Sequence, residues 1–428
     1  MACSARCKAR TCGGHAFVIG IVSAKYALRS LLRHPRRAIL SILGVGIGCG
    51  IGLFATSWMR GSAEMQIRAV SESGAGHLRV VPNEWPERRE NTLRLASWRR
   101  TLDEVRSLPG VKALAMRARA NGLLAFGNRT AGVEVTSVDP KAEFTSNRIV
   151  YKSRLEGRYL RPDDSGKVVI GKALAKRLDV ELDDDLYATL AGRDEIQSAM
   201  FTIVGILETG SRDIDASICH ITLQDIKTIT GYTGPGEISV LLEDHRAIDS
   251  KQKDLAARLA GNNAVITWKE VNPGLAANVE GDRAFMRLLI GIVVIVVSLG
   301  IASAQITAVL ERKSEFAILS ALGMKGKQVV GLVVLEALVV GLGGAVVALM
   351  VGGPAAYYLA REGVSLAGLF GEDFSFGDIL LDPYLHGDFG IWLLWYALGV
   401  SVLATVVASI YPAWLATKVN PVDALRMV

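Results

Sequence analysis

The residues most suggestive of chemistry lie at 166–173 and read GKVVIGKA. This segment nearly matches GxxxxGK followed by Ser or Thr, a loop whose backbone amides hold nucleotide phosphates and whose last hydroxyl group binds Mg²⁺. Ala173 stands at the hydroxyl position, so the magnesium ligand is missing. We therefore predict a strand at 168–170 and a helix at 172–177, with no nucleotide bound between them.

Other catalytic and metal-binding patterns are also missing from the sequence. The six histidines have no spacing typical of a metal site, and no GxSxG nucleophile motif occurs. The five cysteines form neither a zinc pattern nor a disulfide framework. The sequence thus predicts no catalytic residue, no metal site and no cofactor in this chain.

The apolar residues are concentrated in four runs, each long enough to span a membrane as a helix. Half of the 428 residues are hydrophobic and the mean hydropathy is +0.31. A hydrocarbon core about 30 Å thick needs about 20 consecutive apolar residues in a helix. The net charge of +6 fits cytoplasmic flanks better than a nucleic-acid partner, which we do not expect. The predicted spans are 38–59, 288–310, 329–358 and 391–411.

The flanking charges predict the orientation of these spans. Arg29, Arg33, Arg36 and Arg37 precede the first span, and positive residues accumulate on the cytoplasmic side. Both termini are therefore expected in the cytoplasm. We also expect the residues Gly352, Gly353 and Pro354 to break the third span near its outer end, and Pro412 to interrupt the fourth.

The remaining segments complete the predicted organisation. Residues 1–24 read as a disordered leader without a signal-peptide cleavage site, and 25–59 as a cytoplasmic amphipathic segment with the first span. Residues 311–328 form a cytoplasmic segment, 359–390 a short outer loop and 412–428 a cytoplasmic tail. The fold class is an α-helical membrane protein with a large extracytoplasmic α+β domain at 60–287, between the first two spans.

The predicted outer domain contains a strand, a helix and a second strand near its beginning, and the same order of elements near its end. The first set lies at 78–81, 102–108 and 111–117, and the second set at 238–242, 249–259 and 265–268. A split domain with a subdomain inserted at about 156–232 accounts for this arrangement.

Two segments carry patterns that predict contacts with other helices or proteins. Gly44, Gly48 and Gly52 recur every four residues, so they lie along one ridge of the first span and allow another helix to approach. This ridge forms a packing face or lines a substrate cavity. The cytoplasmic segment is an amphipathic helix that caps the bundle or docks into a partner's groove, and we favour docking. Glu336 is the only charge inside the spans, and the sequence assigns it no role.

The sequence ERKSEFAILSALGMKGKQVVGLVVLEAL at 311–338 resembles the signature of the FtsX-like, MacB-like permeases of ABC transporters. The segments YALRSLLRHPRRAILSILGVGIG at 26–48 and YPAWLATKVNPVDALR at 411–426 resemble the family's two other membrane segments. In the outer domain, GHLRVV, VTSVDPKAE, LEGRYL, VVIGKALAKRL and FTIVGILETGSRDID look closest to the LolC and LolE branch.

The resemblance implies a MacB-like periplasmic domain, the bacterial inner membrane as location, and a separate ATPase subunit that binds ATP and Mg²⁺. It also implies a second permease chain, identical or different, contact with membrane lipids, and a lipoprotein cargo extracted by mechanotransmission. Its coupling helix falls on this chain's cytoplasmic segment, where the implied contact residues are Glu311, Arg312, Glu315, Phe316, Leu319, Leu322, Gly323 and Lys325.

Alternative functions remain open within the same resemblance. One is a MacB-type permease for efflux or export of another amphiphile or peptide, and another is a non-transporting FtsX-like regulator of a periplasmic hydrolase. A periplasmic chaperone or adaptor is a further implied partner. The LolC type grips its chaperone with an extended hook, whereas the corresponding connection here, 191–200, is short.

Overall fold

The computed structural model describes residues 33, 35–193, 195–259, 261, 263–365, 375–376, 379–380, 382 and 384–418. The predicted leader and residues 419–428 of the predicted tail lie outside this set. The chain divides into two compact units. The helical unit comprises residues 1–62, 282–363 and 386–428, and the sheet unit comprises 63–281 and 364–385.

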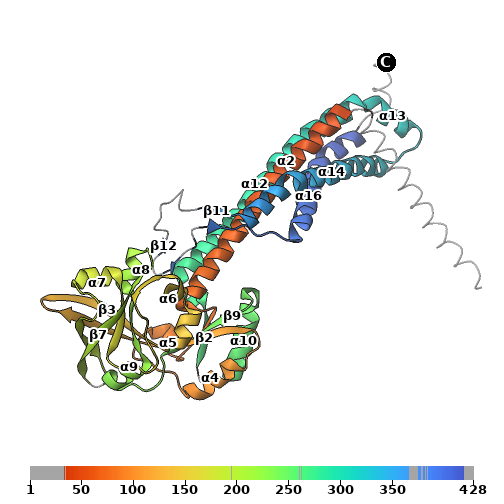
Figure 1. Cartoon of the computed structure of the whole chain (residues 1–428). Coiled ribbons are helices and arrows are strands. Elements are labelled where there is room, and N and C mark those ends of the chain that lie inside the picture. The colour runs from red at the N-terminus through yellow and green to blue at the C-terminus, as the bar shows by residue number, and fades with distance from the viewer. Residues whose placement is uncertain are drawn as a thin grey trace, which may run out of the picture. The chain divides into compact units, whose positions relative to one another are not determined.

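The described part of the helical unit contains four helices long and apolar enough to cross a membrane (Figure 1). A helix rises about 1.5 Å per residue, so 26 residues already exceed the hydrocarbon thickness. Three of the long helices contain a predicted span in full, and α16 contains all of the fourth except residue 391. The helices are α2 (Pro35–Val70), α12 (Pro273–Glu311), the short α13 (Lys313–Ala321), α14 (Gly326–Arg361) and α16 (Trp392–Thr417).

Two prolines lie inside helices that we expected them to interrupt. Pro354 lies within α14 and Pro412 within α16, and both helices continue beyond them. Each proline removes one amide donor, a loss that helices in a bilayer tolerate when neighbouring helices pack around them. The predicted break at 352–354 and the predicted interruption at Pro412 are therefore wrong.

The first part of the sheet unit is a small antiparallel sheet with the strand order β10, β1, β9, β2. Two helices pack on it, and Leu102, Val105 and Leu255 share one apolar core with strand residues. This strand order, together with a strand–helix–strand unit that occurs twice along the chain, is that of a ferredoxin-like fold. The elements are β1 (Leu78–Val81), α4 (Trp98–Arg106), β2 (Val111–Phe126), β9 (Glu237–Leu242), α10 (Ile248–Leu259) and β10 (Ala264–Thr267).

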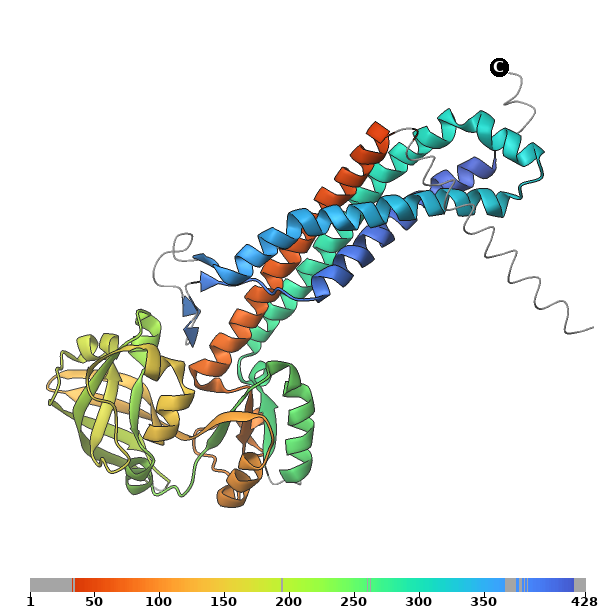
Figure 2. The same ribbon diagram turned by 45° about the vertical axis from the view of Figure 1, so that its right-hand side comes forward.

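The second part is a closed barrel of six strands (Figure 2). It closes because β6 pairs with both β2 and β7. Leu124, Ile170, Leu186 and Phe201 belong to its buried core. Around the barrel the strands are β2, β3 (Arg129–Val138), β8 (Cys219–Thr222), β5 (Lys167–Gly171), β7 (Ile196–Glu208) and β6 (Asp185–Ala191), and β4 (Arg154–Gly157) pairs with β7 outside it.

The long strand β2 belongs to both parts of the sheet unit. Its residues 111–117 pair with β9, whereas residues 122–125 pair with β6. The inserted part therefore begins within β2, near residue 118, rather than at the predicted position 156. The reason is that one continuous strand pairs within both parts, which a search for separate sequence segments does not detect.

Short elements connect these strands and complete the described fold. They are η1 (Ser71–Ala75), α3 (Trp85–Arg88), α5 (Pro140–Ser146), α6 (Arg148–Lys152), α7 (Lys172–Leu178), α8 (Arg212–Ser217), α9 (Leu223–Thr230), η2 (His245–Ala247), α11 (Trp268–Val271), β11 (Val364–Ser365), β12 (Ser375–Phe376), β13 (Ile379–Leu380) and β14 (Tyr384–Leu385). Strand β5 and helix α7 lie where we predicted a strand and a helix in place of a nucleotide loop. The Nζ of Lys172 there donates to Glu208.

Two buried carboxylates hold the junction between the small sheet and the barrel. Glu143 accepts two hydrogen bonds of 2.9 Å from Arg117. Glu237 pairs with Arg79 at 2.9 Å and with Arg119 at 3.4 Å. Burial alone raises the pKa of Glu237, but Arg119, Arg79 and Arg117 outweigh it and lower this pKa to about 2. Glu237 therefore stays ionised, because protonating it would leave buried guanidinium groups without a counter-charge.

The same junction binds the turn that follows α2. Arg117 and the hydroxyl group of Ser239 both donate to the carbonyl oxygen of Gly74 in η1. Gly74 has φ +100°, which glycine adopts without the strain that a side chain would cause. The sequence 71–75 is thereby fixed to two strands at once.

Asp382 attaches the segment 364–385 to the rest of the sheet unit. It pairs with Arg148 of α6 and lies 3.6 Å from the Nζ of Lys152. Burial opposes ionisation, but these two cations lower the pKa of Asp382. Arg148 also lies 3.9 Å from Glu72 in η1, so one arginine joins both segments.

His77 is a buried neutral group whose titration should affect stability. Its Nδ1 accepts a 3.0 Å hydrogen bond from the amide of Leu242, so the single proton of the neutral ring lies on Nε2. Burial, with nearby cationic groups, lowers the pKa of His77 from 6.5 to about 4. Between these values the unfolded chain binds more protons than the folded chain, so stability falls as the pH falls.

We predict that replacing His77 by Asn weakens this pH dependence. The Asn Oδ1 can accept the Leu242 amide as Nδ1 does, but it cannot be protonated in this range. The wild-type sheet unit should lose about 2 kcal/mol through His77 between pH 6.5 and 4.5. Hydrogen exchange of the β9 amides in the intact chain, corrected for intrinsic rates, measures this loss. The same slope in wild type and His77→Asn would contradict the prediction.

Candidate functional site

The candidate site is the segment from Glu311 to Lys325, which contains α13. Helix α12 ends at Glu311, and α13 runs from Lys313 to Ala321. Gly323 then adopts φ +94°, a left-handed conformation that ends the helix. The amide of Met324 donates to the carbonyl oxygen of Leu319 at 3.0 Å and closes this turn. The next helix, α14, begins at Gly326.

One side of α13 is part of the helical unit's core. Phe316 is 2% exposed and packs with Val309, Leu332 and Ala413, which come from α12, α14 and α16. Leu319 is partly buried against the same cluster. Burying a phenylalanine side chain contributes about 1.5–3 kcal/mol, so this contact fixes which face of α13 points inward.

Ion pairs fix the start of the segment to other helices. Arg312 donates from Nε to Glu315 at 3.0 Å and from Nη1 to Glu336 of α14 at 3.2 Å. Its guanidinium group also lies over the ring of Phe316, 5.3 Å from the centroid. At the start of the segment, Glu311 pairs with Arg37 of α2 at 3.0 Å.

The outward side of the segment is apolar and exposed. Ile318 is 50% exposed and Leu322 is 80% exposed. They are four residues apart, so they lie on the same side of a helix. Glu315 and Lys325, each three residues from one member of this pair, are charged. An exposed apolar pair with a charged border is typical of a protein-binding surface.

The structure separates the predicted coupling residues into two groups. Phe316, Leu319 and Arg312 turn inward and position the segment. Leu322, Lys325 and the partly exposed Glu315 face outward, with Gly323 in the turn between α13 and α14.

Sequence reasoning missed the role of Arg37 and Glu336 and the outward position of Ile318. Two features of the sequence could have indicated these roles: Glu336 is the lone charge inside a span, and Arg37 directly precedes a different span. A charge in an apolar setting needs a partner.

The predicted glycine ridge lies mainly against α12. A Cβ atom on Gly48 would lie 2.6 Å from Val297, and one on Gly52 would lie 3.6 Å from Val293. For Gly44, no heavy atom of the described residues, apart from the adjacent part of its own helix, lies within 4 Å of such a Cβ position.

The tighter contact of α2 uses other glycines. A Cβ atom on Gly46 would lie 2.4 Å from Val347, and one on Gly352 would lie 2.6 Å from the carbonyl oxygen of Gly50. Helices α2 and α14 therefore approach through small residues on a ridge that the sequence analysis did not choose. The spacing of four is the same on both ridges, so spacing alone did not identify the partner.

The four long helices differ in how much apolar surface they bury inside the chain. The most apolar window of α12 is 6% buried, against 33%, 44% and 39% for those of α2, α14 and α16. On α12, the side chains of Leu288, Ile295 and Leu299 are more than half exposed. This surface needs lipid, a second chain or an apolar ligand to cover it.

Comparison with known proteins assigns both parts of the chain. Residues 287–421 match the FtsX-like permease C-terminal family, and residues 38–258 match the MacB-like periplasmic core domain. The second match covers more than half of the chain. Together they confirm the predicted fold class, with the periplasmic-type domain between the first two long helices.

Individual relatives are distant but similar along nearly their whole length. The chain is 22% identical over 396 residues to the lipoprotein-releasing system transmembrane protein LolC of Xylella fastidiosa (strain 9a5c), covering 91% of this chain and 93% of that protein. It is 23% identical over 431 residues to the uncharacterized ABC transporter permease YknZ of Bacillus subtilis (strain 168), covering 94% and 98%. The periplasmic region of MacB from Actinobacillus actinomycetemcomitans aligns with 48% of this chain and 95% of that region, at 13% identity and a TM-score of 0.35.

We predict that Glu336→Gln loosens α13. The amide oxygen of the glutamine can still accept a hydrogen bond from Arg312, but the negative charge that pairs Arg312 with α14 is lost, which weakens this contact by about 1 kcal/mol. Hydrogen exchange at 313–321 should become faster while exchange in the sheet unit stays unchanged. The matched control is Glu362→Gln, which removes an exposed glutamate 3.9 Å from Arg361. Equal exchange at 313–321 in both variants would show that Glu336 does not hold α13.

Proposed function

Because the chain belongs to the FtsX-like ABC transporter permease family and carries a MacB-like periplasmic core domain, we propose that it extracts lipoproteins from the inner membrane using a separate ATPase subunit. The chain itself is a non-catalytic, multi-pass transmembrane subunit with an extracytoplasmic domain. In the proposal the partner binds ATP and Mg²⁺, both termini are cytoplasmic, and the sheet unit is periplasmic.

The observation that carries the proposal is the two-sided arrangement of α13. Phe316 and Arg312 attach it to three long helices, while Ile318 and Leu322 remain exposed. A partner that grips the exposed pair would therefore act on α12 and α14 through buried contacts. This arrangement is what transmission of an ATPase movement requires.

The long helices provide the continuation of that movement in the proposal. Helices α2 and α12 are unbroken over 36 and 39 residues and contain the residues that connect the two units in sequence. Glu311 and Arg37 join the two helices at the end next to α13. We infer that α13, α2 and α12 move together when ATP binds the partner.

The exposed apolar surface of α12 supports an acylated cargo and a second permease chain. Acyl chains are apolar and can cover side chains such as Leu288 and Ile295 in the way that bilayer lipid does. The name of the distant relative LolC points to the same cargo class. Lipoprotein release is thus the first candidate for the function.

The short β6–β7 connection favours a second candidate with a different delivery step. The two strands pair continuously up to Ala191 and Ile196, so only residues 192–195 connect them. An extended hook for a chaperone has no place in this hairpin. A MacB-type permease that exports another amphiphile through an adaptor would not need one.

We predict that Ile318→Asp and Leu322→Asp each abolish copurification of the partner ATPase. A carboxylate at the centre of an apolar contact loses its hydration without gaining a partner, which costs several kcal/mol. The matched controls are Ile318→Val and Leu322→Met, which keep an apolar side chain and should retain the ATPase. Normal assembly of both Asp variants would place the docking surface elsewhere.

A second prediction concerns the cargo. The complex purified with its ATPase in the absence of ATP should contain an acylated polypeptide, and addition of ATP and Mg²⁺ should release it. Native mass spectrometry identifies the bound species. Detection of only another amphiphile, released in the same way, would reject lipoprotein extraction and support the second candidate.

A further inference from the structure

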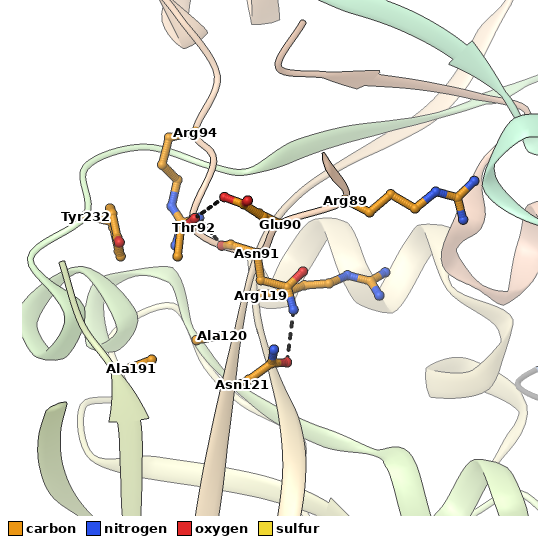
Figure 3. Close-up of a pocket in the computed structure, with 10 residues that line it drawn as sticks. All are labelled: Arg89, Glu90, Asn91, Thr92, Arg94, Arg119, Ala120, Asn121, Ala191 and Tyr232. Carbon is orange, nitrogen blue, oxygen red and sulfur yellow. Dashed lines mark hydrogen bonds between the residues drawn. The ribbon is translucent and has the colours of Figure 1, made fainter. Parts of the chain in front are cut away.

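A cavity of about 320 Å³ lies in the sheet unit, apart from the coupling segment (Figure 3). The loop 89–94, strand β2, the end of β6 and the residue Tyr232 after α9 contribute to its wall. Ala120 and Ala191 lie on one side of it, and their short side chains leave the space open. Its volume is at the lower end of the range for ligand pockets, so it suits a small ligand or a chain end.

Arg94 is a cation without a counter-charge in this wall. Its Nη1 donates to the carbonyl oxygens of Asn91 at 2.5 Å and Leu93 at 2.9 Å, and the guanidinium group stacks 4.6 Å from the ring centroid of Tyr232. No carboxylate of the described residues lies within 4 Å of it, and its buried Nε has no hydrogen-bond acceptor there. Burial lowers the pKa of Arg94, which reflects the cost of this uncompensated charge.

Three other charged residues line the cavity, Arg89, Glu90 and Arg119. Arg119 pairs with Glu134 at 2.8 Å and with Glu237 at 3.4 Å. Glu90 accepts a hydrogen bond from Thr92 at the rim. Arg89, which donates to the carbonyl oxygen of Glu270 at 3.0 Å, also lines the cavity, and its positive charge offsets the negative charge of Glu90. The net charge left to be neutralised is therefore the single positive charge of Arg94.

Neutral donors and an aromatic ring complete the wall. The amide nitrogen of Asn91 donates to Oδ1 of Asn121, so the amide nitrogen of Asn121 is left to donate to a ligand. Figure 3 shows this amide pair opposite Tyr232 and Arg94. The Nη1 of Arg94 is occupied by two carbonyl oxygens and its Nε is buried, so Nη2 is the guanidinium nitrogen left to donate a charge-assisted hydrogen bond to a carboxylate.

We propose that this cavity binds the carboxylate of a small peptide-like ligand, with Arg94 as the anion-binding group and Asn121 as a neutral donor. A carboxylate carries one negative charge and matches Arg94. A phosphate dianion would add an unbalanced negative charge beside Glu90 and Glu134. This site is independent of ATPase docking at α13, so either proposal can fail while the other stands.

Isothermal titration of the full chain in detergent tests the proposal with three probes. N-acetyl-dialanine, which has a free carboxylate, should bind at least tenfold more tightly than its C-terminal amide and more tightly than inorganic phosphate. Equal binding of acid and amide would overturn the proposal, and so would tighter binding of phosphate.

Three variants connect binding to the named side chains. Arg94→Gln should weaken binding of the acid at least tenfold. Asn121→Asp should also weaken it, because it keeps the Oδ1 acceptor for Asn91 but replaces the donor by a negative charge. Asn121 is exposed, so this variant remains informative if Arg94→Gln does not fold. The control Arg99→Gln removes an exposed arginine of α4 and should bind as wild type. Wild-type affinity in Asn121→Asp would contradict the assignment.

Discussion

The sheet unit depends on the pairing of buried arginines with Glu143 and Glu237. These carboxylates lie where the small sheet meets the barrel, and the strand β2 supplies Arg117 and Arg119 to both cores. Loss of either carboxylate would leave buried guanidinium groups uncompensated, a change that costs about 3–5 kcal/mol. Because Arg117 also binds the carbonyl oxygen of Gly74, the same pairing determines where the turn after α2 is held.

The helical unit uses the same constraint on a smaller scale. Arg312 lies among apolar side chains, so it must find carboxylates, and Glu315 and Glu336 supply them from two helices. This requirement and the burial of Phe316 together fix the rotation of α13. Phe316 then turns into the core, and Ile318 and Leu322 are left outside. The exposed pair is thus a consequence of an internal charge contact as much as of its own sequence.

Local patterns made much of this architecture predictable. Hydropathy located the four long helices. The helical spacing of apolar residues and the charges beside them located α13, which ends before Gly323. What local patterns did not show were contacts made at a distance. The choice of Gly46 over Gly44 depends on where α14 lies, and the closure of the barrel depends on β6 meeting β2. Arg312 and Glu336 are 24 residues apart, so their pairing follows only from the packed helices.

The two prolines inside α14 and α16 have a mechanical consequence. Each lacks the amide that would bond to the carbonyl oxygen four residues earlier, at Met350 and Ala408, so bending there breaks no hydrogen bond. Pro354 lies near the end of α14 that is far from α13, and Pro412 lies near the end of α16 that packs against it. The two helices are therefore most compliant at opposite ends, and a load applied at α13 would bend α16 close to its source and α14 far from it.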